Sequence, residues 1–154
     1  PSNESLLRTD NLGNSLGGSF LEKPAFLAGG HGLTSTASDY MKFAQMHLNK
    51  GTLNGTRILS EDAIDLMRNN QLPEDVKAIG QPYPGNVFGL DFAVVENSEI
   101  FQKAPVGTHW WWGIAGSWFW IDPVNETVFI GMIQNNDILL SLQIHRAARS
   151  AIYE

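Results

Sequence analysis

The sequence has 154 residues, 43% of them hydrophobic and 17% charged, a balance typical of a folded chain with a hydrophobic core rather than a disordered one. A formal net charge of −6 argues against binding to nucleic acid or to an anionic membrane, and no apolar run approaches the ~20 residues that a membrane-spanning helix needs. The absence of cysteine excludes a disulfide scaffold, a thiolate metal site and a cysteine nucleophile.

Residues 1–35 are rich in Gly, Ser and Asn and show no lasting periodicity, which predicts a loop with at most one short helical turn. A loop of this length is unusual in a compact domain. We therefore expect this segment to pack against something outside the chain. The chain starts at Pro1 without a Met or a signal peptide, which leads us to expect that an N-terminal portion is missing.

Two helices are predicted next. Thr36 is a suitable N-cap for the first, with Asp39 in its first turn and Gly51 as its stop. Residues 51–55 form a turn-rich link, and Ser60 caps the second helix, which ends near residues 69–70. The apolar positions of the two helices are Tyr40, Phe43, Ala44 and His47 or Leu48, then Ile64, Leu66 and Met67.

After a long proline-containing loop over 71–87, the pattern changes to strands. Residues 122–125 read as a turn, and the short connections predict an antiparallel sheet. The predicted strands are 88–95, a short one at 100–103, then 108–112, 117–121 and 127–134.

The last predicted element is a helix from about Asp137 to Tyr153. Arg146 and Arg149 suit the negative C-terminal half of its dipole. Its expected apolar stripe is Leu139, Leu142, Ile144, Ala148 and Ile152. The order of elements predicts an α+β fold, with helices followed by an antiparallel sheet and a C-terminal helix that covers it.

Three segments carry a family resemblance. Residues 29–39 have the form Gly-Gly-x-Gly-Leu-x-Ser-Thr-x-x-Asp at a helix start, and 111–117 read Trp-Trp-Gly-Ile-Ala-Gly-Ser. A Gly-bounded turn at 51–60 adds a weaker match. Together these segments resemble serine hydrolases of the β-lactamase and penicillin-binding-protein-like family, especially the esterase branch related to class C β-lactamases. The resemblance covers roughly residues 26–153.

The resemblance implies the C-terminal part of a β-lactamase/transpeptidase-like fold. Residues 1–87 would be the remainder of the helical region with its long loops. Residues 88–154 would be the sheet strands and the C-terminal helix, and both would belong to one larger catalytic domain. The family also suggests a periplasmic or secreted protein.

The third catalytic motif of the family, in its Trp-x-Gly form, matches Trp111 to Gly113. The resemblance assigns the second oxyanion-hole donor to the backbone N–H of Ile114, and Trp112 and His109 to substrate binding. Such donors stabilise the tetrahedral oxyanion of acyl transfer by about 3–4 kcal/mol each. Trp111 stands where β-lactamases have Lys, so there is no charge to hold a substrate carboxylate, and small neutral esters or amides are the expected substrates.

The family's nucleophile and base lie in Ser-x-x-Lys, and no Ser of this sequence has Lys three residues later. The second motif, Tyr-x-Asn or Tyr-x-Ser, is also absent. We therefore expect the chain alone to be inactive and to contribute its third motif to a complete serine hydrolase. No cofactor is implied, and no two His show ligand spacing, so no metal is assigned.

Two alternatives remain open from the sequence. One is a noncatalytic binding or regulatory module derived from the same fold. The other is a Trp-rich ligand-binding module, which would require several solvent-exposed indoles in a row. Trp118 and Trp120 lie two residues apart on a predicted strand and so share a face, which favours core packing for these two. Because the chain lacks the first strands and helices of the family fold, its sheet should have an unpaired edge. We therefore expect it to bind the N-terminal portion of the same protein or a second copy of the chain.

Overall fold

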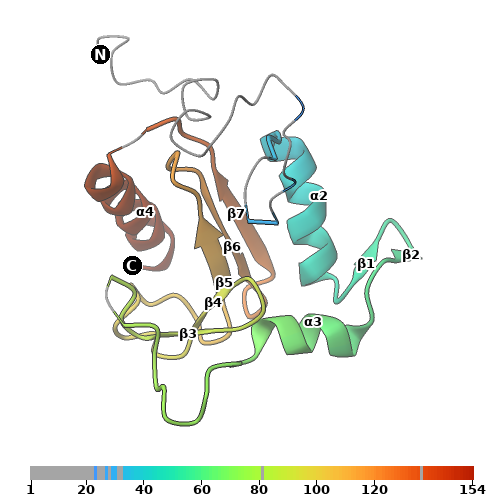
Figure 1. Ribbon diagram of the computed structural model, residues 1–154, viewed down its shortest axis with the longest axis horizontal. Helices are drawn as coiled ribbons and strands as arrows, with labels where there is room; N and C mark the ends of the chain where they lie inside the picture. Colours follow the sequence, from blue (N-terminus) through green and yellow to red (C-terminus); the bar gives the residue numbers. More distant parts are fainter. Residues whose placement is uncertain (1–22, 24–26, 28, 31–32, 81, 136) are drawn as a thin grey trace.

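A computed structural model describes residues 23, 27, 29–30, 33–80, 82–135 and 137–154. The predicted loop at 1–35 lies almost entirely outside these residues. The described part has three layers, with a central sheet, helix α4 on one face and helix α2 on the other (Figure 1). This arrangement confirms the α+β prediction. No helix within the described residues has the length and hydropathy required to cross a membrane.

The sheet is a five-stranded antiparallel meander in the order β3-β4-β5-β6-β7. Its strands are β3 (Asn86–Phe88), β4 (Ala93–Val95), β5 (His109–Trp112), β6 (Trp118–Asp122) and β7 (Thr127–Gly131). The prediction of one strand over 88–95 was wrong, because the Gly89 N–H donates to the Phe92 carbonyl at 2.8 Å and closes a turn between β3 and β4. The short strand predicted at 100–103 is also a turn, since Gln102 and Lys103 adopt left-handed φ angles of 47° and 58°.

Helices α2 (Ala37–Leu48) and α3 (Glu61–Arg68) begin where the sequence predicts. The Thr36 hydroxyl accepts from the Asp39 N–H at 3.1 Å, and the Ser60 hydroxyl accepts from the Ala63 N–H at 3.1 Å. The link between the helices contains a small hairpin that was not predicted, β1 (Thr52–Leu53) with β2 (Thr56–Arg57). Helix α2 packs directly on β6 and β7, so the 1–87 and 88–154 stretches share a core.

Helix α4 (Ile138–Tyr153) has the predicted bounds but buries a different stripe. Ser141, His145 and Arg149 are its buried residues, whereas Leu139 is 73% exposed. Indoles of β5 and β6 already fill the sheet face beneath it. His145 and Arg149 pack on these rings and form hydrogen bonds with the Gly116 carbonyl and the Gln102 side chain. Ile144 and Ala148 do pack on the sheet core, as predicted.

The turn at 122–125 is confirmed and is tied to the end of α4. The buried Asp122 carboxylate accepts from the backbone N–H groups of Val124 and Asn125 at 2.9 and 3.0 Å. It also accepts from the Tyr153 hydroxyl at 2.9 Å. The hydrogen bond between Tyr153 and Asp122 connects the last turn of α4 to the turn between β6 and β7.

The close approach of Gly131 to Trp118 gives a test of the packing. A Cβ on Gly131 would lie 2.3 Å from carbons of the Trp118 indole, which is held between Phe129 and His145. We expect Gly131→Ala to lower the free energy of unfolding by about 1–3 kcal/mol, as overpacked core positions do. Urea denaturation followed by circular dichroism measures the change.

Gly29→Ala is the matched control, since no described residue lies within 4 Å of a Cβ at that position. It should change the free energy of unfolding by less than about 0.5 kcal/mol. If the two variants had equal stability, the contact between β7 and the Trp118 indole would be looser than the structure indicates.

Candidate functional site

The residues of the Trp-x-Gly motif lie at the end of β5 and in the turn that leads to β6. The Gly113 N–H donates to the Ser117 carbonyl at 2.8 Å, and the Gly116 N–H donates to the Gly113 carbonyl at 2.8 Å. Ile114 and Ala115 therefore form the tip of the hairpin.

Gly113 and Gly116 of this hairpin differ in what surrounds the position of a Cβ atom. Gly116 has a φ of +93° and lies under α4, where a Cβ would come within 2.9 Å of the Ser141 hydroxyl and of Ile133. Its role is therefore structural. Among the described residues, a Cβ on Gly113 would meet only the Ser117 carbonyl at 4.0 Å, so none of them fills the space in front of Gly113.

The backbone N–H of Ile114 points away from the hairpin. In a trans peptide the C=O and the following N–H point in opposite directions, and the Gly113 carbonyl is turned inward to Gly116. The Ile114 N–H makes no hydrogen bond among the described residues, and Ile114 is 51% exposed. On its other side, β5 pairs with β4 only as far as Trp110, so no described strand covers the edge beyond that residue.

Trp111 and Trp112 point to opposite faces of the sheet. Trp111 lies opposite Phe119 on the α2 face, with its ring centroid 5.1 Å from that of Phe88. Trp112 donates its indole N–H to the Tyr83 hydroxyl at 2.6 Å, and its ring lies 5.9 Å from the ring of His145 on α4. The structure therefore brings Trp111, Gly113 and Ile114 together along one edge, without the Trp112 indole.

His109 is buried and is not brought to the hairpin tip. It is 1% exposed, and its ring lies 5.9 Å from that of His47 and 5.4 Å from that of Phe92. Burial lowers the pKa of both His47 and His109 to about 4, so both imidazoles are neutral at pH 7. In the described structure His109 is a core residue between α2 and the sheet.

The described residues do not support a Trp-rich binding surface. Trp110, Trp118 and Trp120 are buried, and the other two tryptophans are half-buried, so the row of exposed indoles that such a module requires is not present. Within the described ranges, no group of three or more His, Asp or Glu side chains is placed to hold a metal ion.

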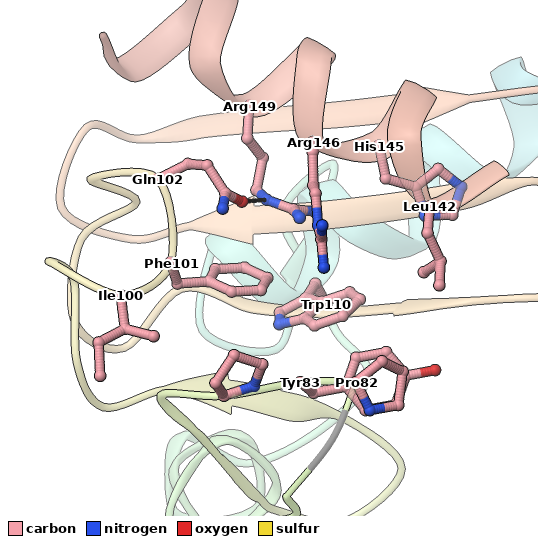
Figure 2. Close-up of a pocket in the computed structure, with 11 residues that line it drawn as sticks. Pro82, Tyr83, Ile100, Phe101, Gln102, Trp110, Leu142, His145, Arg146 and Arg149 are labelled. Atoms are coloured by element: carbon pink, nitrogen blue, oxygen red, sulfur yellow. Dashed lines mark hydrogen bonds between the residues drawn. The ribbon is translucent and has the colours of Figure 1, made fainter. Parts of the chain in front are cut away.

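Sequence reasoning missed a cavity beneath α4. Trp110 and Phe101 line it, and Arg149 and Arg146 reach into it from α4 (Figure 2). The helix pattern contained one signal for it. Arg149 follows His145 by four residues and Ser141 by eight, which places it on the stripe of α4 that faces the sheet.

Comparisons with known proteins agree with this architecture. The β-lactamase family model matches residues 5–150. Two Mycobacterium tuberculosis proteins, Protein Rv1367c of strain H37Rv and Uncharacterized protein MT1414 of strain CDC 1551, are each 36% identical over 120 residues. The match covers 73% of this chain and 30% of each relative, so the chain spans less than a third of their length.

Two solved structures share the fold. Simvastatin synthase (LovD) from Aspergillus terreus superposes with a TM-score of 0.65 at 20% identity, over 83% of this chain and 36% of that one. EstCE1, described as a hydrolase with promiscuous acyltransferase activity, superposes with a TM-score of 0.63 at 23% identity, over 84% of this chain and 33% of that one. With the family match over nearly its whole length, the chain belongs to the β-lactamase family.

Proposed function

We propose that this chain is the C-terminal portion of a serine esterase or amidase that works through an acyl-enzyme. Its contribution is the edge formed by Trp111, Gly113 and Ile114. The observation that carries the proposal is the Ile114 N–H, which is directed outward beside the open space at Gly113 and has no partner among the described residues. A fixed donor of this kind suits an oxyanion that develops in the transition state.

Trp111 supports the choice of substrate. Its indole is half-buried on the α2 face and presents an apolar ring next to Gly113 rather than a cation. A substrate carboxylate would find no opposite charge at this position, and so neutral esters or amides fit better.

The nucleophile would come from outside these residues. The sequence contains no Ser-x-x-Lys, and the chain spans only 30% of the relatives that it matches. We infer that a separate or preceding N-terminal portion of the same protein supplies the serine and its base, and that both portions enclose the substrate between them.

Two surfaces support assembly with such a portion or with a second copy. Strand β7 is an edge of the sheet within the described residues, with its outer backbone groups available for pairing. The first turn of α4 exposes three large apolar side chains in succession, Ile138, Leu139 and Leu140.

The chain alone should lack serine-hydrolase activity, because no activated nucleophile can be assigned to it. Purified chain should neither hydrolyse p-nitrophenyl acetate above background nor be labelled by a fluorophosphonate. The same assays on the protein that also carries the upstream portion are the positive control. Stoichiometric labelling of a serine within these 154 residues would overturn the proposed division of roles.

Removal of the Ile114 N–H should impair the complete enzyme. Ile114→Pro deletes this donor, and proline is well tolerated at the first central position of a β-turn. We expect kcat to fall about 100-fold or more, as it does when other oxyanion donors are lost. Ile114→Val keeps the N–H and should retain most of the activity. Equal activity of the proline and valine variants would remove Ile114 from the oxyanion hole.

The purified chain should not be a free monomer, because its β7 edge and the apolar first turn of α4 favour a partner. Multi-angle light scattering should give a mass above 17.0 kDa, and denaturing electrophoresis should identify either a companion fragment or the chain alone. A monodisperse 17.0 kDa particle with a cooperative melt would contradict this expectation.

A further inference from the structure

The cavity beneath α4 is too small for an organic ligand. Its volume is about 30 Å³, and a space of roughly 10–15 Å³ holds one water molecule. Its aromatic wall is already packed, because the Trp110 ring stacks on Phe101 at a centroid separation of 4.9 Å and the Arg149 guanidinium carbon lies 4.1 Å from the centre of the Phe101 ring. A ligand of this cavity is therefore limited to water or to an ion of similar size.

Arg149 is a buried cation that lines this cavity. It is 5% exposed, and its Nε donates to the Gln102 amide oxygen at 2.9 Å. Its Nη atoms have no hydrogen-bond partner, and its charge has no ion-pair partner, among the described residues. The Phe101 and Trp110 rings attract the guanidinium more weakly than a full negative charge would, so most of the cost of burying this cation is not offset by them.

A second guanidinium adds to the positive charge. Arg146, one helical turn before Arg149, lines the same cavity and forms no ion pair within the described ranges. Figure 2 shows both side chains descending from α4 toward the Trp110 and Phe101 rings. Burial, and then repulsion from Arg146, lowers the pKa of Arg149 to about 10, so Arg149 remains charged at neutral pH.

Two carboxylates near the cavity already have partners. Asp122, buried in the same layer, accepts hydrogen bonds from Tyr153 and from the 124–125 turn. Glu99, in the turn that also lines the cavity, pairs with Lys103. Within the part of the chain that the structure describes, the two arginines thus border a small space to which no side chain brings a negative charge.

We propose that this cavity is a binding site for a monatomic anion, and that chloride is the ion it takes from solution. Chloride is only slightly larger than water, requires no free ring face, and accepts hydrogen bonds from any direction. It accepts from the Nη groups of Arg149 and from Arg146 at once, and so offsets part of the cost of the buried charge. Water in the same space would leave both charges unpaired, and sulfate and phosphate are larger ions.

Chloride NMR tests the binding directly, since the resonance of free chloride broadens when the ion exchanges with a protein site. Addition of the full chain, as it purifies, to a NaCl solution should broaden the line in proportion to the protein concentration. Bromide is a monatomic anion of similar size and should remove the excess broadening by competition. Gluconate is too large for the cavity and should not remove it.

Thermal unfolding gives a second readout, because a ligand that binds only the folded state raises the melting temperature. When sodium gluconate is replaced by NaCl at constant ionic strength, the melting temperature should rise by about 2–4 °C. Constant ionic strength keeps the screening of surface charges equal in the two salts. Sodium bromide should give the same gain as NaCl.

Three variants test whether the two arginines hold the ion. Arg149→Met keeps an apolar chain over Phe101 and should lose most of the excess broadening and the gain in melting temperature. Arg146→Gln removes the exposed member of the pair and should weaken chloride binding severalfold. Lys42→Gln is the control, because it removes one exposed positive charge from α2, on the opposite face of the sheet, and it should keep both effects.

Two results would each overturn the proposal. One is a chloride line that the unsubstituted chain does not broaden, or broadens no more than Arg149→Met and Arg146→Gln do, which would make Arg149 a structural cation satisfied by its rings, Gln102 and water. The other is displacement of chloride by sulfate at lower concentration than by bromide, which would assign the cavity to an oxyanion. If Arg149→Met did not fold, Arg146→Gln and the bromide competition would decide the question.

Discussion

Burial of strand β6 on both faces is the constraint on which the other layers depend. All five of its residues are buried, and their side chains alternate between the two helices. Trp118 and Trp120 face α4, while Phe119 and Ile121 face α2. A strand with two apolar faces requires a layer on each side, so the positions of α2 and α4 follow from β6. The side chains of the neighbouring strand β5 also alternate between the α2 face and the α4 face of the sheet.

That division gives the two consecutive tryptophans of β5 different surroundings. Trp111 packs on the α2-side cluster and also against Tyr83 at the border of the two clusters, next to Gly113, whereas Trp112 donates its indole N–H to the Tyr83 hydroxyl and lies beside His145 of α4. The proposed active-site edge thus combines a backbone group, the Ile114 N–H, with a side chain, the Trp111 indole. The Gly113–Gly116 hydrogen bond sets the direction of the Ile114 N–H, and β-strand alternation sets the face of the indole.

The sequence predicted the elements that local chemistry determines. Caps at Thr36 and Ser60 located two helices, and the alternation at Trp118 and Trp120 located the core face of the sheet. It did not predict the buried stripe of α4. Helical periodicity predicts that the most apolar face of a helix is buried. Here the sheet face beneath α4 is already filled with indoles, and a polar side chain can be buried there if it forms a hydrogen bond. His145 does so with the Gly116 carbonyl at 2.9 Å. The cavity at Arg149 was missed for the same reason, since it depends on loops brought together by tertiary packing.

The distribution of tryptophan has a consequence for spectroscopy. All five indoles lie in β5 and β6, and none lies in α2, α3 or the connection between them. Intrinsic fluorescence of this chain therefore reports on β5 and β6, through three buried indoles and the half-buried rings of Trp111 and Trp112. Local opening of residues 49–80 would leave that emission largely unchanged, so a probe of backbone structure is needed to follow the helical side of the molecule.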